Sequence, residues 1–234
     1  MPFVSFKNYK IYYCLKPLFA GIKQINKEIA FENLCIFDNV AKTKKLSYIF
    51  VFGTVLGAVR EKDFITHDED IDLGISIDNK ELFFSVLNEL KNEGFRIVRW
   101  DRRGLMSILR KGEYIDIYIF QPLYDNIYHC CGEPILKEHL FETTTIGFKG
   151  KDFFVPKQFE EYMNFCYGED WRTPIPFFSF NKVSFLKKGA LYMKEIIKAY
   201  LPNSIFYRMT GKLEYAILEK YARRGKIKLK EYYS

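Results

Sequence analysis

The chain has 234 residues, 48% of them hydrophobic, which is enough to build one large domain or a domain with an appendage. No stretch reaches the roughly 18 to 20 uninterrupted apolar residues of a membrane span, and the N-terminus lacks a signal-peptide pattern, so we expect a cytoplasmic protein. The formal net charge of +7 is unevenly distributed: residues 186–234 carry 12 Lys and Arg against 4 Asp and Glu, and residues 1–185 are close to neutral.

The cysteines are five in number and irregular in spacing, which argues against the disulfide framework of a small secreted protein and favours buried thiols. An alternative is a metal site formed by His129, Cys130 and Cys131 with His139 downstream. Adjacent cysteines rarely bind one ion, and no Cys-x-x-Cys pair supports this alternative.

Hydrophobic spacing predicts alternating helices and strands over the first half of the chain. Helices are predicted at residues 27–45, 55–60 and 79–93, the last ending at Gly94. Strands are predicted at 47–52, 70–75 and 95–100, and residues 105–109 and 114–120 are predicted to form a hairpin through 110–113.

A further helix is predicted to start at Val155-Pro156 and to end at Gly168. The composition shift after residue 176 is the only boundary signal, so we expect one domain at residues 1–185 and a basic helical C-terminal extension at 186–234. Helices are expected there at 191–201 and 213–224, interrupted by Pro202 and Gly211.

Acidic residues form the strongest chemical signal. Asp70 and Asp72 alternate with apolar residues, so a strand places both carboxylates on one face. Asp116 lies between Ile115 and Ile117 in the next apolar strand, where a lone carboxylate calls for a reason. Three such carboxylates can hold one or two Mg²⁺ or Mn²⁺ ions, which favour oxygen ligands, and Asp116 could also accept a proton from an attacking hydroxyl.

Phosphate-binding residues are expected nearby. Gly53 and Thr54 open a helical turn whose backbone N–H groups and hydroxyl can hold a phosphate, and Arg60 and Lys62 on the way to the acidic strand can neutralise its oxygens. The alternative is a solvated acidic turn with ordinary surface charges. The role of His67, just before the acidic run, stays open.

Two motifs resemble the signature of the LicD family, which includes phosphocholine transferases and fukutin-type ribitol-phosphate transferases. The first combines FGTVLGAVR at residues 52–60 with FI at 64–65 and DEDIDL at 68–73. The second combines VPK at residues 155–157 and Tyr162 with YGEDWRTP at 167–174. The resemblance covers residues 25–176, while the tail after Phe178 shows no family pattern and His67 stands where the family often has Trp.

The resemblance implies an α+β nucleotidyltransferase fold, akin to the DNA polymerase beta palm, with a mixed sheet flanked by helices. By residue match, Gly53 and Thr54 form the phosphate turn, Asp70 and Asp72 the metal pair and Asp116 the third carboxylate, with Arg60 on the donor phosphate. The implied reaction moves phosphocholine, phosphoethanolamine or a polyol phosphate from a donor such as CDP-choline to a sugar hydroxyl of a surface glycan or glycolipid, as in lipopolysaccharide or capsule modification.

Two other functions fit parts of the sequence. A nucleotidyltransferase acting on RNA or protein could use the basic tail to bind polyanions, although the motif at 167–174 argues against this and nucleic acid is not the expected partner. A non-catalytic scaffold of glycan assembly could use the same tail for peripheral contact with the anionic inner face of the membrane. The intact carboxylate trio argues against the loss of catalysis.

Overall fold

A mixed β-sheet forms the centre of the computed structural model, which describes residues 2–7, 9–16, 18, 23–175 and 184–229. Its strands follow the order β3-β4-β7-β6-β5. Their bounds are β3 (Ile49–Phe50), β4 (Ile71–Ser76), β5 (Arg96–Asp101), β6 (Leu105–Arg110) and β7 (Glu113–Tyr124). Strands β4 and β7 run parallel, and the other neighbours in this order are antiparallel. Strand β7 continues past the others to pair with β8 (Ile127–Cys130), which pairs with β9 (Glu133–Leu136).

Alternation along β4 and β7 separates an apolar face from a polar face. Ile71 pairs with Ile115, Leu73 with Ile117 and Ile75 with Ile119, and all six side chains are buried in the main core. Helix α1 (Lys27–Lys44) packs against β7 and against α3 (Lys80–Asn92), which follows the short 3₁₀ helix η1 (Ile77–Asn79). The remaining positions of β4 and β7 carry the acidic side chains on the opposite face.

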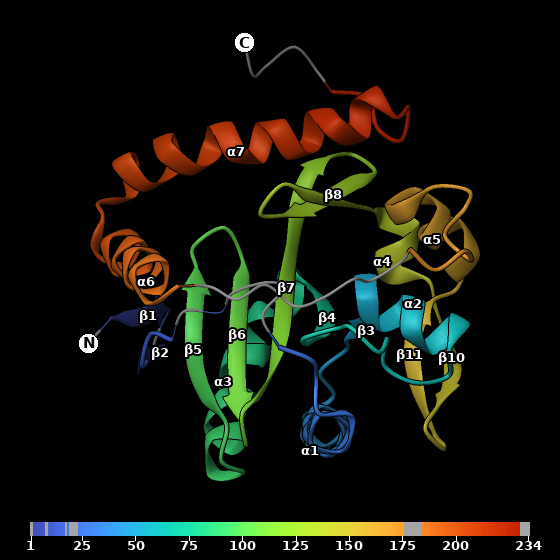
Figure 1. Cartoon of the computed structure of the whole chain (residues 1–234), viewed down its shortest axis with the longest axis horizontal. Helices are drawn as coiled ribbons and strands as arrows, with labels where there is room; N and C mark the ends of the chain where they lie inside the picture. The colour runs from blue at the N-terminus through green and yellow to red at the C-terminus, as the bar shows by residue number, and fades with distance from the viewer. Residues whose placement is uncertain (1, 8, 17, 19–22, 176–183, 230–234) are drawn as a thin grey trace.

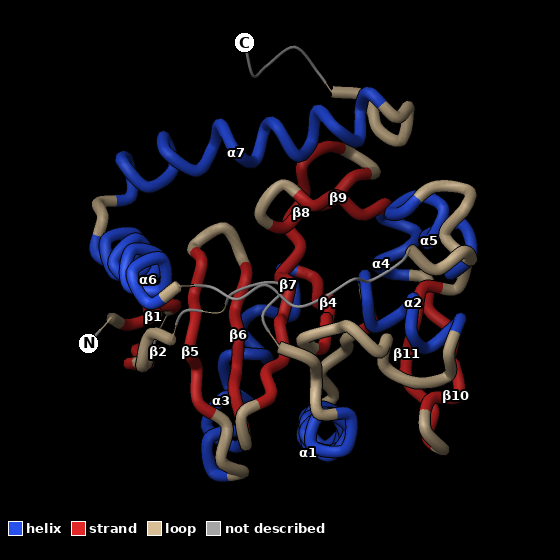
Figure 2. Tube along the Cα trace, viewed as in Figure 1, coloured by secondary structure: helices blue, strands red, loops and turns tan. Residues whose placement is uncertain are grey.

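A second group of elements lies beside β3 in Figure 2. It comprises α2 (Phe52–Arg60), α4 (Lys137–Phe141), α5 (Phe159–Tyr167) and the hairpin of β10 (Thr143–Phe148) with β11 (Lys151–Pro156). Buried rings join the hairpin to the sheet: Phe50 stacks on Phe153 with centroids 5.0 Å apart, and Phe148 meets Phe64 edge-on at 4.9 Å. A separate hairpin, β1 (Phe3–Phe6) with β2 (Tyr9–Tyr12), lies near the N-terminus.

Most predicted elements are confirmed within a few residues. Three are corrected: the strand at 47–52, the helix from Val155-Pro156 and the helix break at Gly211. The predicted strand 47–52 shrinks to β3 because α2 already begins at Phe52, so Gly53 and Thr54 lie inside the first helical turn. The helix predicted from Val155-Pro156 begins at Phe159, because both residues pair with β10 as the end of β11, a position where a strand tolerates proline.

The C-terminal segment forms α6 (Phe185–Tyr200) and α7 (Asn203–Arg223). Pro202 separates them as predicted, but α7 continues through Gly211, since a single exposed glycine costs a helix only about 1 kcal/mol. Figure 1 shows α7 running above the sheet and over the β8–β9 hairpin. Leu218 and Tyr221 of α7 are buried, and the Tyr221 hydroxyl donates to Glu133 at 2.9 Å.

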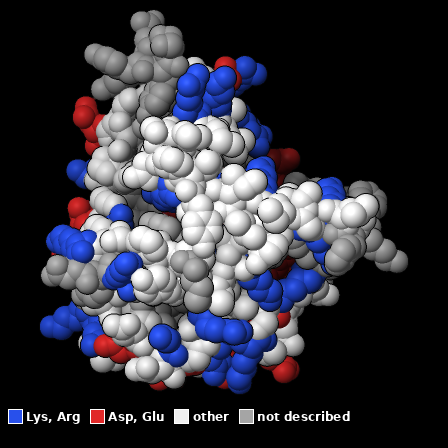
Figure 3. All heavy atoms as spheres, turned by 90° about the vertical axis from the view of Figure 1, so that its left-hand side faces the viewer, with Lys and Arg blue, Asp and Glu red and all other residues white. Residues whose placement is uncertain are grey.

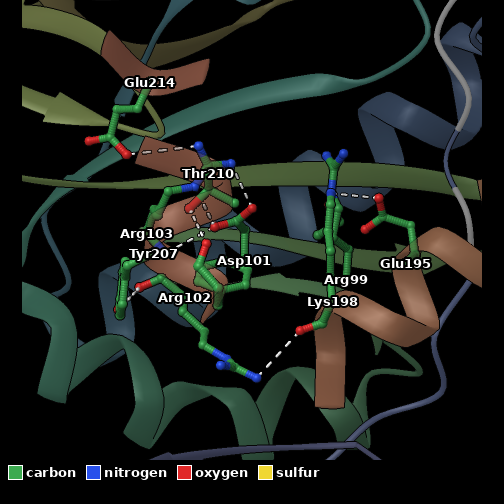
Figure 4. A network of polar contacts seen from close by, with 11 residues as sticks. Arg99, Asp101, Arg102, Arg103, Glu195, Lys198, Tyr207, Thr210 and Glu214 are labelled. Atoms are coloured by element: carbon green, nitrogen blue, oxygen red, sulfur yellow. Dashed lines mark hydrogen bonds and ion pairs between the residues drawn. The ribbon is translucent and has the colours of Figure 1, made fainter. Parts of the chain in front are cut away.

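A polar network fixes this helix pair to the β5–β6 turn (Figure 4). Arg102 donates to the carbonyls of Ala199 at 3.0 Å and Leu201 at 2.6 Å, which closes the C-terminal end of α6. Arg103 is held by Asp101 and lies 3.8 Å from Glu214 of α7. Among the described residues, no helix combines the length and apolarity that crossing a membrane requires.

Candidate active site

A row of polar side chains crosses four neighbouring strands on the face opposite the isoleucines. Asp72 on β4 is the register partner of Asp116 on β7, which is in turn paired with Ser107 on β6. Ser107 is paired with Arg99 on β5, next to a bulge in that strand. Because register partners point to the same side of a sheet, these four residues lie in line.

The three predicted carboxylates meet at this row. One oxygen each from Asp70, Asp72 and Asp116 lie within 4.8 Å of one another. Asp72 and Asp116 are only 7% and 2% exposed, and Asp70 immediately precedes β4. Two oxygens that each bind one Mg²⁺ at about 2.1 Å are at most about 4.2 Å apart, so a small rotation of the side chains would bring these oxygens onto one ion. The parallel pairing of β4 with β7 therefore creates a cluster that the sequence shows only in pieces.

The electrostatics of the cluster favour a bound cation. Burial raises the pKa of Asp70 and of Asp72 well above the usual range, and the neighbouring carboxylates raise them further. Burial also raises the pKa of Asp68 to about 6, and its Oδ2 is buried without a hydrogen-bond partner in the structure. Carboxylates that repel one another in a low-dielectric site gain most from a divalent ion. The donor set of hard oxygens fits Mg²⁺ or Mn²⁺.

Two tyrosines flank Asp116 on β7 and share its face. The Tyr114 side chain hydrogen-bonds to Asp70, and that of Tyr118 hydrogen-bonds to Asp72. Burial raises the pKa of both phenols, so they stay protonated as donors to the carboxylates. The pattern Tyr-Ile-Asp-Ile-Tyr is visible in the sequence, and its period of two was the signal that could have assigned these tyrosines to the site.

Arg99 and Ser107 complete the site and were missed by the sequence reasoning. The Ser107 hydroxyl and the Arg99 guanidinium donate to the two oxygens of Asp116, and Arg99 Nε donates to Ser107 Oγ at 2.7 Å. Burial raises the pKa of Asp116, and Arg99 opposes this rise. Arg99 therefore partly compensates the charge of the third carboxylate and fixes its orientation.

The first turn of α2 is tied to the acidic strand. The backbone N–H of Asp72 donates to Thr54 Oγ1 at 2.7 Å, and the N–H of Val51 donates to the Asp72 carbonyl at 3.1 Å. A Cβ placed on Gly53 would lie 2.8 Å from Asp68 Oδ2 and 3.3 Å from Asp72 Oδ2. Gly53 and Thr54 therefore lie against the carboxylates and hold the backbone of Asp72 in place. They also form the N-terminal end of a helix that faces the same site.

Arg60 and Lys62, the two cations predicted to bind phosphate, lie at the end of α2 and in the turn after it. Arg60 ends α2 about 10 Å along the helix axis from Gly53, and its guanidinium pairs with Glu61 at 2.8 Å. Lys62 is exposed in the following turn, in the left-handed region with φ 57°. The structure thus gives Arg60 a contact with Glu61 and Lys62 an exposed position, and their predicted contact with donor phosphate stays a prediction.

The alternative histidine–cysteine metal site finds no support in the structure. His129 Nδ1 faces Glu214 at 2.9 Å, while His139 packs edge-on against the rings of Tyr162 and Phe165. Burial lowers the pKa of His139. Within the described part of the chain, the aspartate trio is the cluster whose ligand atoms converge as a metal site requires.

The mixed sheet holds Asp72 on β4 and Asp116 on its parallel neighbour β7, with Asp70 directly before β4, so that the three carboxylates form a cluster that could hold a metal ion. Residues 45–158 match the sequence model described as LicD/FKTN/FKRP, nucleotidyltransferase domain. The chain therefore carries a LicD-family domain, and the resemblance seen in its motifs is confirmed.

Individual relatives add little about substrate. "Uncharacterized protein RT0683" of Rickettsia typhi (strain ATCC VR-144 / Wilmington) is 27% identical over 138 residues, which cover 59% of this chain and 35% of that protein. The chain thus matches about a third of the length of this relative.

Similar solved structures include the lincosamide antibiotic adenylyltransferase LnuA with lincomycin, at 14% identity and TM-score 0.43, covering 70% of this chain and 96% of that one. ANT(2")-Ia in complex with adenylyl-2"-tobramycin is similar at 14% identity and TM-score 0.43, covering 80% and 96%. A TM-score of 0.43 is too low to carry an argument about fold or substrate.

Proposed function

We propose that this protein is a metal-dependent phosphotransferase that moves a substituted phosphate from a CDP-activated donor to a sugar hydroxyl of a surface glycan or glycolipid. The observation that carries the proposal is the convergence of Asp70, Asp72 and Asp116 in a LicD-family domain. The candidate groups are phosphocholine, phosphoethanolamine and polyol phosphates. The choice among them rests on the family resemblance, because a metal ion at the trio would contact the phosphate rather than the head group.

The reaction forms one bond and breaks one bond. The acceptor hydroxyl oxygen bonds to the phosphorus that carries the head group, and the bond from this phosphorus to the oxygen of CMP breaks, so that CMP leaves with the electron pair. Mg²⁺ or Mn²⁺, when bound by the trio, would neutralise the phosphate oxygens in this displacement. Asp116 is the candidate acceptor for the hydroxyl proton. Ser107 and Arg99 each donate one hydrogen bond to a different oxygen of Asp116, and the second lone pair of each oxygen is left for a proton or a cation.

The residues around the trio would position it. Tyr114 and Tyr118 hold Asp70 and Asp72 through hydrogen bonds that leave other carboxylate lone pairs for a cation. Thr54 fixes the backbone of Asp72, and the missing side chain of Gly53 lets Asp68 and Asp72 lie close to the start of α2, where backbone N–H groups could bind a phosphate. Burial of this face excludes water from the carboxylates, which strengthens electrostatic interactions there.

The test is a donor screen. CDP-choline, CDP-ethanolamine, CDP-ribitol and CDP-glycerol are each incubated with the purified protein and Mg²⁺ or Mn²⁺, with and without a sugar acceptor, and CMP release is measured. We expect release with at least one donor, its loss on chelation, and its loss in Asp72→Asn. The matched control is Asp152→Asn, an exposed carboxylate on β11, which should keep full activity. Full activity of Asp72→Asn would refute the assignment of the site, and transfer of the nucleotide part to RNA or protein would favour the nucleotidyltransferase alternative.

A further inference from the structure

Helices α6 and α7 present apolar side chains to solvent along the groove between them. Met193 and Ile197 of α6 are each 53% exposed, and Met209 and Leu213 of α7 are each 59% exposed. These four residues line one groove of about 610 Å³, which Phe206 and Leu201 complete. Leu186, Tyr200 and Ile205 extend the apolar surface beyond the groove, at 83%, 61% and 46% exposure. Contiguous exposed apolar surface of this kind marks an interaction site.

The charges around this α6–α7 groove are of one sign. Within residues 184–229, each acidic side chain has a basic or histidine partner in the protein: Glu195 pairs with Lys198, Glu214 with His129 and Arg103, and Glu219 with Arg223. The exposed charges left at the surface are basic: Lys187, Lys188, Lys194, Arg208, Lys212, Lys220, Arg224 and Lys228. Lys194 lines the groove itself, and Arg208 and Lys212 share a second hollow with Ile205 and Met209. Figure 3 shows the side formed by α6 and the start of α7, with a broad area of uncharged atoms bordered by Lys and Arg.

The helix pair is anchored from behind, so its apolar residues are held outward. Arg102 binds the last carbonyls of α6 and lies 4.8 Å from the Phe206 ring of α7 (Figure 4). Tyr221 and Leu218 fix the other end of α7 to the β8–β9 hairpin. A surface fixed in this way can bind a partner without first paying the entropy of ordering two helices.

We propose that the α6–α7 groove docks the protein on an anionic lipid bilayer, with its methionine, leucine and isoleucine side chains in the interface and its basic residues on the headgroups. Amphipathic helices with Lys and Arg beside apolar residues bind anionic membranes in this way. A second copy of the chain fits less well, because two basic faces would repel each other. A nucleic acid would use the cations but gain little from exposed Met193 and Met209.

The groove also lies near a residue of the candidate active site. Lys198 and Arg103 line the groove and, on their other side, a cavity of about 190 Å³ that Arg99 borders. Arg99 is the residue that holds Asp116. On the function proposed above, docking through α6 and α7 would therefore bring the site close to an acceptor that is itself anchored in the membrane. This last step rests on the proposed function, whereas the docking does not.

The docking is tested by co-sedimentation of the full chain with vesicles of phosphatidylcholine alone or with about one third phosphatidylglycerol, at low and high salt. We expect binding to the anionic vesicles and its weakening by salt. Each reversal in Lys194→Glu and Lys212→Glu removes one attraction and adds one repulsion, which lowers partitioning about 30-fold. Met193→Glu combined with Met209→Glu should abolish binding, because it removes the apolar contact and adds two repulsions.

Matched controls distinguish the effect of changing groove residues from the effect of making the same kind of change elsewhere on the surface. Lys151→Glu and Phe154→Glu change exposed residues of β11 and should leave most of the vesicle binding intact. Circular dichroism and melting curves would test whether each variant folds. Equal sedimentation with neutral and anionic vesicles at low salt would overturn the proposal. Dimerisation that depends on the groove, without lipid binding, would also overturn it. So would RNA binding that is weakened by the lysine variants and not by the methionine variant, in a protein that does not bind vesicles.

Catalysis is followed separately as CMP release from soluble donor in the absence of vesicles. The groove variants should retain this activity at the wild-type level. Vesicle binding without CMP release would contradict the proposed function and leave the docking proposal intact. CMP release without vesicle binding would contradict the docking proposal and leave the proposed function intact.

Discussion

Gly53→Ala should separate the geometry of the carboxylates from the stability of the fold. The added Cβ would lie 2.8 Å from Asp68 Oδ2 and 3.3 Å from Asp72 Oδ2, closer than ordinary van der Waals contact. Overpacking costs about 1 to 3 kcal/mol, at the low end here because the ends of two side chains can rotate away. Alanine in a helix returns up to about 1 kcal/mol relative to glycine. We therefore expect a net loss of at most about 1 kcal/mol, which corresponds to a fall in Tm of no more than about 2 to 4 °C.

The effect on metal binding should be larger. A carboxylate pushed aside by Cβ cannot keep the ligand distances that Mg²⁺ requires, and disturbing the supports of a metal site typically costs about 10 to 100-fold in affinity. Isothermal titration with Mn²⁺ measures this loss directly, and CMP release should fall with it.

Gly57→Ala in the same helix is the matched control. Its Cβ would meet backbone atoms, the Asp63 carbonyl oxygen at 2.6 Å and the Ile65 nitrogen at 3.2 Å, which cannot rotate away. We expect it to lower Tm more than Gly53→Ala does and to leave the Mn²⁺ affinity of the folded protein unchanged. Wild-type Mn²⁺ affinity in Gly53→Ala would refute the reasoning, because it would mean that crowding the Asp72 carboxylate does not disturb the binding of the ion.

Three further outcomes are expected. Burial and neighbouring charges raise the pKa of Asp72 in the folded protein. The stability that Asp72 contributes to the metal-free protein is therefore complete below its unfolded-state pKa near 4 and is lost as pH rises through its folded-state pKa. Asp72→Asn should flatten this fall in melting curves and raise the Tm of the metal-free protein at pH 7, while it abolishes CMP release. Arg99→Met leaves Asp116 buried without its cation, which should cost about 3 to 5 kcal/mol in urea unfolding, with partial recovery in Arg99→Lys; an unchanged unfolding midpoint would show that the pair contributes nothing. Arg102→Ala removes the hydrogen bonds that hold the end of α6, so limited proteolysis near Pro202 should accelerate while CMP release from soluble donor stays constant; equal cleavage rates would contradict the anchoring role.

The sequence was sufficient for those parts of the site that depend on local patterns. Alternation assigned Asp70 and Asp72 to one face of a strand, and the isolation of Asp116 among apolar residues marked it as special. The structure brings all three together. What alternation could not give is the pairing partner of each strand, because the register Asp72–Asp116 joins segments more than forty residues apart.

Arg99 was missed for the same reason. Its strand carries two arginines, Arg96 and Arg99, and no local signal separates them. A bulge before Arg99 and the register with Ser107 decide that this arginine reaches Asp116. Pro156 illustrates the opposite failure: its preference for a first helical turn is real, but pairing of β11 with β10 overrides it.

The arrangement of charges makes the trio costly unless it binds an ion. Like charges in a buried site repel, and Arg99 hydrogen-bonds to the carboxylate of Asp116 and offsets part of the charge of Asp70. Burial and the neighbouring carboxylates still hold the pKa of Asp70 and of Asp72 well above the usual range, and the hydroxyls of Tyr114 and Tyr118 are neutral, so they leave the negative charge in place. A fold that needed these positions only for stability would place apolar residues there, as it does on the isoleucine face of the same two strands. The excess negative charge at Asp70 and Asp72 is therefore the feature that supports our proposal that the trio binds a divalent cation, which would in turn contact a phosphate.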